Sequence, residues 1–133
     1  MKKTISILTI AALIGAAFTS CNTEDPVENE APTVNIMEPS VANNPHMSGQ
    51  SMHIHVEFSD DEELHEAMVS IVRQHDGAEV FHHHIHEHSQ TATVMADTVL
   101  TTAMHSDFVV TATATDHDGE TTTATETIHM HPM

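Results

Sequence analysis

The chain has 133 residues, of which twenty are Asp or Glu and three are Lys or Arg, and its formal net charge is −17 with neutral histidine. Such a charge repels nucleic acid and anionic lipid head groups, which excludes a nucleic-acid-binding protein and favours the binding of cations. Because basic residues are so few, the groups that can offset this charge are protonated histidines, of which the chain has 14, or bound metal ions.

Residues 1–20 have the pattern of a lipoprotein signal peptide. Lys2 and Lys3 precede an apolar run that ends at Phe18 and is too short to cross a bilayer comfortably. Cys21, the single cysteine, follows at a position that resembles the lipobox of bacterial lipoproteins, although Phe18 stands where Leu is usual. Acylation of Cys21 would anchor the chain to a membrane. We therefore expect an outer-membrane lipoprotein of the cell envelope, facing the periplasm or the cell exterior; the alternative is an ordinary secretory signal.

Residues 21–31 are acidic, contain Pro26 and lack a core pattern, which predicts a flexible tether. Residues 32–133 show alternating runs separated by turn residues and predict one all-β domain. Seven short strands in this length predict an immunoglobulin-like antiparallel β-sandwich. The strands are expected at residues 33–37, 52–59, 66–74, 79–88, 91–100, 108–115 and 121–131.

The main alternative within this domain is a helix over residues 60–75. Leu64, Met68 and Ile71 have partial helical spacing. The run VSIV is rich in β-branched residues, and the Asp-Gly pair that follows it is typical of a hairpin, so the strand is favoured. A second tight turn is expected in TDHDGE, residues 115–120.

The order of PTVNIMEPS, VEFSDDEEL, a His-rich middle segment and FVVTATATDHDGE is similar to small immunoglobulin-like lipoproteins of Bacteroidota, of the type called domain of unknown function 4625. The resemblance covers about residues 31–131, and its most specific part is the His-rich segment. It implies the sandwich fold and brings no activity with it. The function must therefore be inferred from the residues themselves.

Histidines alternate along three of the expected strands, in the segments MHIHVE, FHHHIHEHS and IHMHPM. Residues i and i+2 of a strand share a face about 7 Å apart, so a His-x-His pair and one ligand from a neighbouring strand can form a zinc site. Glu57 and Glu87 are expected to ligate or orient these imidazoles. The predicted metal ligands are His53, His55, His82, His84, His86, His88, His129 and His131.

The sandwich topology predicts two chemically different ends. One end would gather histidines and methionines, which together suit copper, while imidazole alone suits zinc, nickel or copper(II). These residues are His46, Met47, Met52, His53, His75, Met104, His105, His129 and His131. The other end would gather the carboxylates of residues 60–63, Asp116 and Asp118, which could bind calcium or be ordinary solvated turns.

These patterns predict a lipid-anchored cell-envelope domain that captures or buffers zinc or copper. Its expected partners are transition-metal ions and, through Cys21, a membrane. We expect no enzyme, because the chain has no glycine-rich phosphate loop and a sandwich with so few large apolar residues offers little depth for a pocket. The alternative function is an adhesion or assembly module whose histidine surface is incidental or senses pH.

Overall fold

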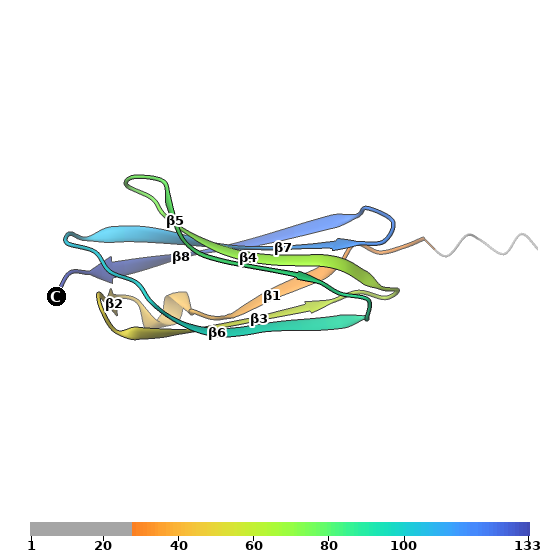
Figure 1. Cartoon of the computed structure of the whole chain (residues 1–133), viewed down its shortest axis with the longest axis horizontal. Helices are drawn as coiled ribbons and strands as arrows, with labels where there is room; N and C mark the ends of the chain where they lie inside the picture. Colours follow the sequence, from red (N-terminus) through yellow and green to blue (C-terminus); the bar gives the residue numbers. More distant parts are fainter. Residues whose placement is uncertain (1–27) are drawn as a thin grey trace, which may run out of the picture.

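A computed structural model describes residues 28–133 as a sandwich of two β-sheets (Figure 1). The strands in chain order are β1 (Thr33–Glu38), β2 (His46–Met47), β3 (Ser51–Ser59), β4 (Leu64–Arg73), β5 (Ala78–His86), β6 (Thr91–Val99), β7 (Ser106–Asp116) and β8 (Thr121–His131). A 3-10 turn, η1 (Val41–Asn43), follows β1. The predicted all-β, immunoglobulin-like sandwich is confirmed, with eight strands where seven were expected. The predicted signal peptide, Cys21 and most of the tether lie outside the described residues.

The two sheets differ in size. The smaller has the strand order β1-β3-β6, and the larger has the order β2-β8-β7-β4-β5. Neighbouring strands run antiparallel except for β2, which pairs in parallel with the end of β8. The sequence did not predict β2, because His46 and Met47 alone are too short a segment to show an alternating pattern.

Alternating apolar residues explain why the sheets pack against each other. In β3, Ile54, Val56 and Phe58 are buried while the residues between them are exposed or half-exposed. β7 has the same period, with Phe108 and Val110 fully buried. Successive strand residues point to opposite faces, so each sheet presents one apolar face to the other. Each of these large side chains stabilises the fold by about 1.5–3 kcal/mol through burial.

Strand β4 begins earlier than the sequence predicted, and its presence decides against the helix alternative. Leu64 pairs with Asp116 and Glu66 pairs with Thr115, so His65 is an extra residue in a β-bulge. Leu64 is fully buried, whereas the side chains of His65 and Glu66 are each 43% exposed. The bulge therefore turns two successive side chains away from the core.

The connections between strands form two poles of the sandwich (Figure 1). The C-terminal pole contains β2, the end of β8 and the connections at residues 74–77 and 100–105. The tether pole contains residues 28–32 and the connections at residues 60–63, 87–90 and 117–120. Asn29 Nδ2 donates to Asp116 Oδ2 at 2.7 Å, which fastens the start of the described chain to the tether pole.

Two glycines allow the turns that follow β4 and β7. Gly77 has φ +70° and Gly119 has φ +89°, a backbone conformation that other residues rarely adopt. The predicted turns are thus confirmed, although the β4–β5 connection spans residues 74–77 and is longer than a two-residue Asp-Gly hairpin loop. Across residues 28–133, no helix is long and apolar enough to cross a membrane.

Candidate metal centres

Three groups of histidine and glutamate side chains can each hold a metal ion. In every group the ligand atoms, one from each residue, lie within 4.8 Å of one another. The first group lies at the C-terminal pole, and the other two lie at or near the tether pole. They are His105–His129–His131, Glu63–His88–His117 and Glu66–His84–His86.

The group at the C-terminal pole consists of three imidazoles. His129 and His131 alternate along β8 with the buried Ile128 and Met130, and His105 comes from the connection before β7. The ring centres of His105 and His131 are 4.4 Å apart, those of His129 and His131 5.2 Å, and those of His105 and His129 5.8 Å. Imidazoles bound tetrahedrally to zinc, with zinc–nitrogen distances near 2.0 Å, have ring centres about 5 Å apart. The three rings are therefore at the separation that one ion requires.

A carboxylate orients one of these rings. Asp107 and His129 are directly opposite each other on β7 and β8, and Asp107 Oδ1 lies 2.6 Å from His129 Nδ1. When Nδ1 carries the proton it donates to Asp107, which leaves the lone pair of Nε2 free to bind a metal. Carboxylate–histidine pairs of this kind orient the ligands of many metal sites.

The surroundings of His131 favour its neutral form. Partial desolvation lowers the pKa of His131 below its ordinary value of 6.5, and the neighbouring His105 and His129 lower it further when they are protonated. Neutral imidazole is the form that binds metal, because protonation occupies the lone pair. His131 is therefore in its ligand form over a wider pH range than an isolated histidine would be.

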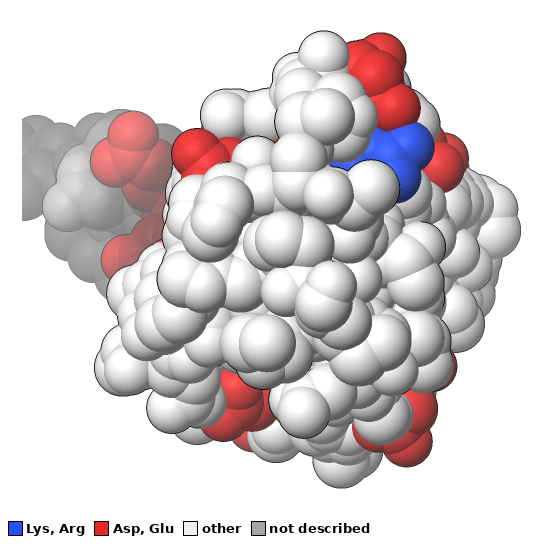
Figure 2. Space-filling view, turned by 90° about the vertical axis from the view of Figure 1, so that its left-hand side faces the viewer, with Lys and Arg blue, Asp and Glu red and all other residues white. Residues whose placement is uncertain are grey.

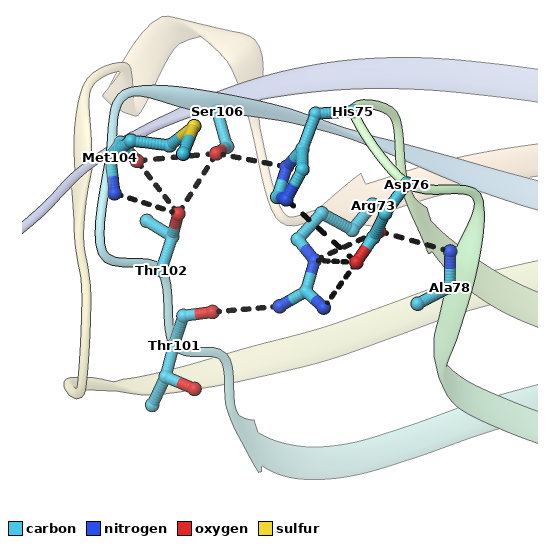
Figure 3. Close-up of polar contacts among 8 residues, drawn as sticks. All are labelled: Arg73, His75, Asp76, Ala78, Thr101, Thr102, Met104 and Ser106. Carbon is cyan, nitrogen blue, oxygen red and sulfur yellow. Dashed lines mark hydrogen bonds and ion pairs between the residues drawn. The ribbon is translucent and has the colours of Figure 1, made fainter.

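Hydrogen bonds order the connection that carries His105 (Figure 3). The Thr102 hydroxyl lies 2.7 Å from the Met104 carbonyl oxygen and 2.8 Å from the Ser106 hydroxyl. Ser48 donates from its hydroxyl to the Thr102 carbonyl and accepts from the Thr102 N–H. These contacts lie on both sides of His105 and hold its backbone in place.

The only arginine of the chain is engaged at the same pole (Figure 3). Arg73 Nη2 lies 2.7 Å from Asp76 Oδ2, and Arg73 Nη1 donates to the Thr101 carbonyl at 3.4 Å. The hydrogen bond from Arg73 is the main reason that the pKa of Asp76 falls from 3.8 to about 2. Figure 2 views this pole and shows a surface that is mostly neither acidic nor basic, with one basic group between acidic ones. A metal ion at the histidines would therefore meet little competing positive charge.

The group Glu66–His84–His86 lies on neighbouring strands of the larger sheet, where Glu66 of β4 is opposite His86 of β5. Glu66 Oε2 lies 3.8 Å from His84 Nε2, and Glu66 Oε1 lies 3.6 Å from His86 Nδ1. The ring centres of His84 and His86 are 4.8 Å apart. All three side chains are at least 39% exposed, so this group is open to solvent.

The group Glu63–His88–His117 brings together three connections at the tether pole. His88 Nδ1 lies 3.1 Å from His117 Nε2, and Glu63 Oε1 lies 3.4 Å from His88 Nδ1 and 3.7 Å from His117 Nε2. The sequence predicted carboxylates alone at this pole. It therefore missed that histidines lie among them, although His117 stands inside the DHDG turn that the sequence singled out.

The four histidines predicted as one ladder have three different surroundings. His84 and His86 share Glu66, whereas His88 lies beyond the end of β5 and contacts Glu63. His82 contacts only Glu79 among the described acidic residues, at 3.5 Å. The predicted alternation holds, because Phe81 and Ile85 are half-buried against the core while the even-numbered histidines face away from it.

The remaining predicted ligands lie on the outer face of β3. His53 Nδ1 is 2.9 Å from Asp97 Oδ1, and His55 Nε2 is 3.4 Å from Glu57 Oε1. Their ring centres are 6.4 Å apart, and among residues 28–133 neither belongs to a three-ligand group. Of the residues expected at the C-terminal pole, His105, His129 and His131 come together, while Met52 is buried in the core.

Comparisons with known proteins identify the fold. No protein-family model matches the chain, and no curated protein matches it. A DUF4466 family protein from Parabacteroides merdae is 11% identical, with a TM-score of 0.54 over 73% of this chain and 43% of that one. The chain thus spans less than half of that protein. A superoxide reductase (neelaredoxin) from Ignicoccus hospitalis is 9% identical, with a TM-score of 0.50 over 77% of this chain and 82% of that one.

These similarities support one sequence inference in part and correct another. A neighbour from a Bacteroidota agrees with the resemblance at the level of fold, while membership of domain of unknown function 4625 stays a prediction. The prediction that the chain is not an enzyme is wrong, because it relied on the sandwich having too little depth for an active site. A superoxide reductase has a similar sandwich, so the fold does not exclude catalysis.

Proposed function

We propose that this protein is a lipid-anchored lipoprotein of the cell envelope that captures or buffers zinc or copper at the C-terminal pole. The proposal rests on the group His105–His129–His131, in which three imidazoles lie within ligand distance of one another and Asp107 orients one of them. The proposed organisation is a signal peptide at residues 1–20, a tether at 21–31 and the metal-binding domain at 32–133, in agreement with the small Ig-like lipoproteins that the sequence resembles.

The ligand set favours an exchangeable metal ion. Three protein ligands leave a fourth position for water or for a ligand from a partner, as in zinc sites that remain reactive. Imidazole nitrogens suit zinc and copper(II). Met47 lies directly opposite His131 in the β2–β8 pair and is 39% exposed, so a thioether is also available for copper(I).

The charge of the chain supports capture of cations from dilute solution. Twenty acidic residues face one arginine once the predicted signal has been removed, and Asp76 engages that arginine. A field of one sign raises the local concentration of ions of the other sign and speeds their association. The field is not specific for any metal, so selectivity must come from the imidazoles.

Titration of the chain from residue 21 onward with zinc and with copper, followed by calorimetry and native mass spectrometry, tests this function. Changing His129 and His131 together to Gln should abolish tight binding at the C-terminal pole. The matched control changes His53 and His55 to Gln, which removes a His-x-His pair of the other sheet and should leave that binding intact. Equal affinity in the two double variants, or only weak binding by the unchanged chain, would favour the adhesion or assembly module.

Anchoring requires a separate experiment. The contact of Asn29 with Asp116 supports entry of the tether at the tether pole, which would place the metal-binding C-terminal pole away from the membrane. Mass spectrometry of the N-terminal peptide should show acylation of Cys21. Spin labels at Gly77 and at Gly119 of the acylated protein in bilayers should show Gly119 closer to the lipid. An unmodified Cys21 would refute the anchor, and the reverse order of depth would refute the orientation.

A further inference from the structure

We propose that Glu63, His65, His88 and His117 form a second metal site, a closed four-ligand site for zinc that fastens together the connections of the tether pole. This site uses none of the residues at the C-terminal pole and goes beyond the proposed capture function. Its role would be structural, because four protein ligands complete a tetrahedral shell and leave no position for exchange.

Three of the four ligands are already at ligand–ligand distances. Two atoms bound tetrahedrally to a zinc ion about 2.0 Å away lie about 3.3 Å from each other. The observed separations are 3.1 Å between His88 Nδ1 and His117 Nε2, 3.4 Å between Glu63 Oε1 and His88 Nδ1, and 3.7 Å between Glu63 Oε1 and His117 Nε2. An ion can therefore bind with little movement of these atoms.

His65 supplies the fourth ligand because of the β-bulge at the start of β4. Its ring centre lies 4.8 Å from that of His117 and 6.3 Å from that of His88. Within residues 28–133, the buried Nδ1 atom of His65 has no hydrogen-bond partner. Buried polar atoms normally have a hydrogen-bonding partner. A metal ion bound to the lone pair of His65 Nδ1 would take the place of that partner.

His65 also lies near the group Glu66–His84–His86, and its shortest ring separation, to His117, favours the tether-pole group. Its ring centre is 6.0 Å from that of His86, compared with 4.8 Å from that of His117. The spacing of about 5 Å expected for two imidazoles on one tetrahedral ion is met by His117, and binding of the ion would bring His65 closer to His88, whose ring centre is 6.3 Å away. The His65 Nε2 atom lies 4.0 Å from Glu66 Oε1, which is too long for a hydrogen bond.

The backbone holds the four ligands in place. The His117 N–H donates to the Glu63 carbonyl at 3.3 Å, and the Glu87 N–H, next to His88, donates to the His65 carbonyl at 3.1 Å. The three chain segments that carry the ligands are thus joined by main-chain hydrogen bonds. A site built on such fixed backbone loses little conformational freedom when the ion binds.

The chemistry of the ligands selects the metal. Calcium prefers six to eight oxygen ligands, and this site offers three nitrogens and one carboxylate. Zinc commonly takes four nitrogen, sulfur or carboxylate ligands in structural sites. Of the carboxylates that the sequence predicted at this pole, Glu63 is therefore the one that would bind the metal, in a zinc site whose other three ligands are imidazole nitrogens.

Zinc stoichiometry and cobalt spectroscopy on the chain from residue 21 onward test the proposal. The unchanged chain should bind a zinc ion at each pole, and cobalt in the closed site should show the strong visible absorption of tetrahedral coordination. His65→Gln should weaken binding at the tether pole by more than about 100-fold, since loss of a residue that only orients a ligand already costs about 10- to 100-fold. His88→Gln, on a connection outside the strands, should have the same effect and guards against misfolding caused by a change in the bulge.

His86→Gln is the matched control, because it removes a histidine near His65 that the proposal leaves out of the site. It should leave the tetrahedral cobalt spectrum unchanged. The spectra are compared in chains that also carry the double change of His129 and His131 to Gln, which removes the other tetrahedral site. Retention of the spectrum by the His65 variant in that background, or its loss from the His86 variant, would overturn the assignment of His65. The double change of His129 and His131 to Gln should preserve the tether-pole zinc, so failure of the capture site and failure of this site give different results.

Discussion

Replacing Asp107 with Asn tests whether a carboxylate prepares His129 to bind metal. The side chain keeps its shape, and an Asn oxygen can still accept a hydrogen bond from His129 Nδ1. The acceptor is then neutral, however, so the hydrogen bond is weaker. If the amide is flipped, its NH₂ group donates to Nδ1, and the imidazole proton then stands on Nε2, where it blocks metal binding. The separation of 2.6 Å between Asp107 Oδ1 and His129 Nδ1 indicates a strong hydrogen bond in the unchanged protein.

The expected magnitude follows from the role of such partners in metal sites. Loss of an orienting partner typically lowers metal affinity about 10- to 100-fold, which is about 1.4 to 2.8 kcal/mol of binding free energy. The side chains of His129 and Asp107 are 42% and 45% exposed, so the change should have little effect on folding. The free energy of unfolding of the metal-free variant should stay within about 0.5 kcal/mol of that of the unchanged protein.

Calorimetric titration with zinc measures the effect, and Asp97→Asn is the matched control. Asp97 contacts His53 Nδ1 at 2.9 Å across two antiparallel strands, in the same manner as Asp107 contacts His129, but His53 belongs to no three-ligand group among residues 28–133. Affinity at the C-terminal pole should fall in the Asp107 variant and stay unchanged in the Asp97 variant. An equal affinity in both variants would refute the orienting role of Asp107.

Three further predictions concern pH and metal. Zinc or copper at about one hundred times the dissociation constant should stabilise the fold by about 2.7 kcal/mol, measured as a higher melting temperature at pH 7. The increase in melting temperature should become smaller towards pH 5, because protons compete with the metal for imidazole. An undiminished increase at pH 5 would point to carboxylate ligands. Arg73→Gln should raise the carboxyl pKa of Asp76 from about 2 towards 3.8 in an NMR titration, and an unchanged pKa would refute Arg73 as the main cause of the low value. Because the folded-state pKa is the lower one, the stabilisation from this pair is present above pH 3.8 and is lost as the pH falls towards 2. In the unchanged protein the pKa of His131 should lie below 6.5 by NMR, and it should rise when His105 is changed to Gln; a pKa above 6.5 would contradict this environment. Because the unfolded state binds the His131 proton more readily than the folded state, protonation of this residue should lower the stability of the unchanged protein as the pH falls below 6.5.

The sequence by itself determined seven of the eight strands, all but β2, and the direction of most of their side chains. The alternation of histidine with Ile128 and Met130 in β8 required His129 and His131 to face away from the core, because the apolar residues must be buried and strand side chains alternate. The same reasoning placed His53 outside and Ile54 inside in β3. These are local properties, since a period of two can be read from a few successive residues.

The tertiary structure decided which of these side chains share a site. His105 and Asp107 reach the histidines of β8 through the pairing of β7 with β8, and no property of either segment alone specifies that register. His65 faces outward because a bulge adds one residue to β4, which breaks the period of two on which the sequence prediction depended. His88 and His117 meet because two connections end at the same pole. Metal sites require several ligand atoms around one point, and chain folding brings those atoms together from segments that are distant in sequence.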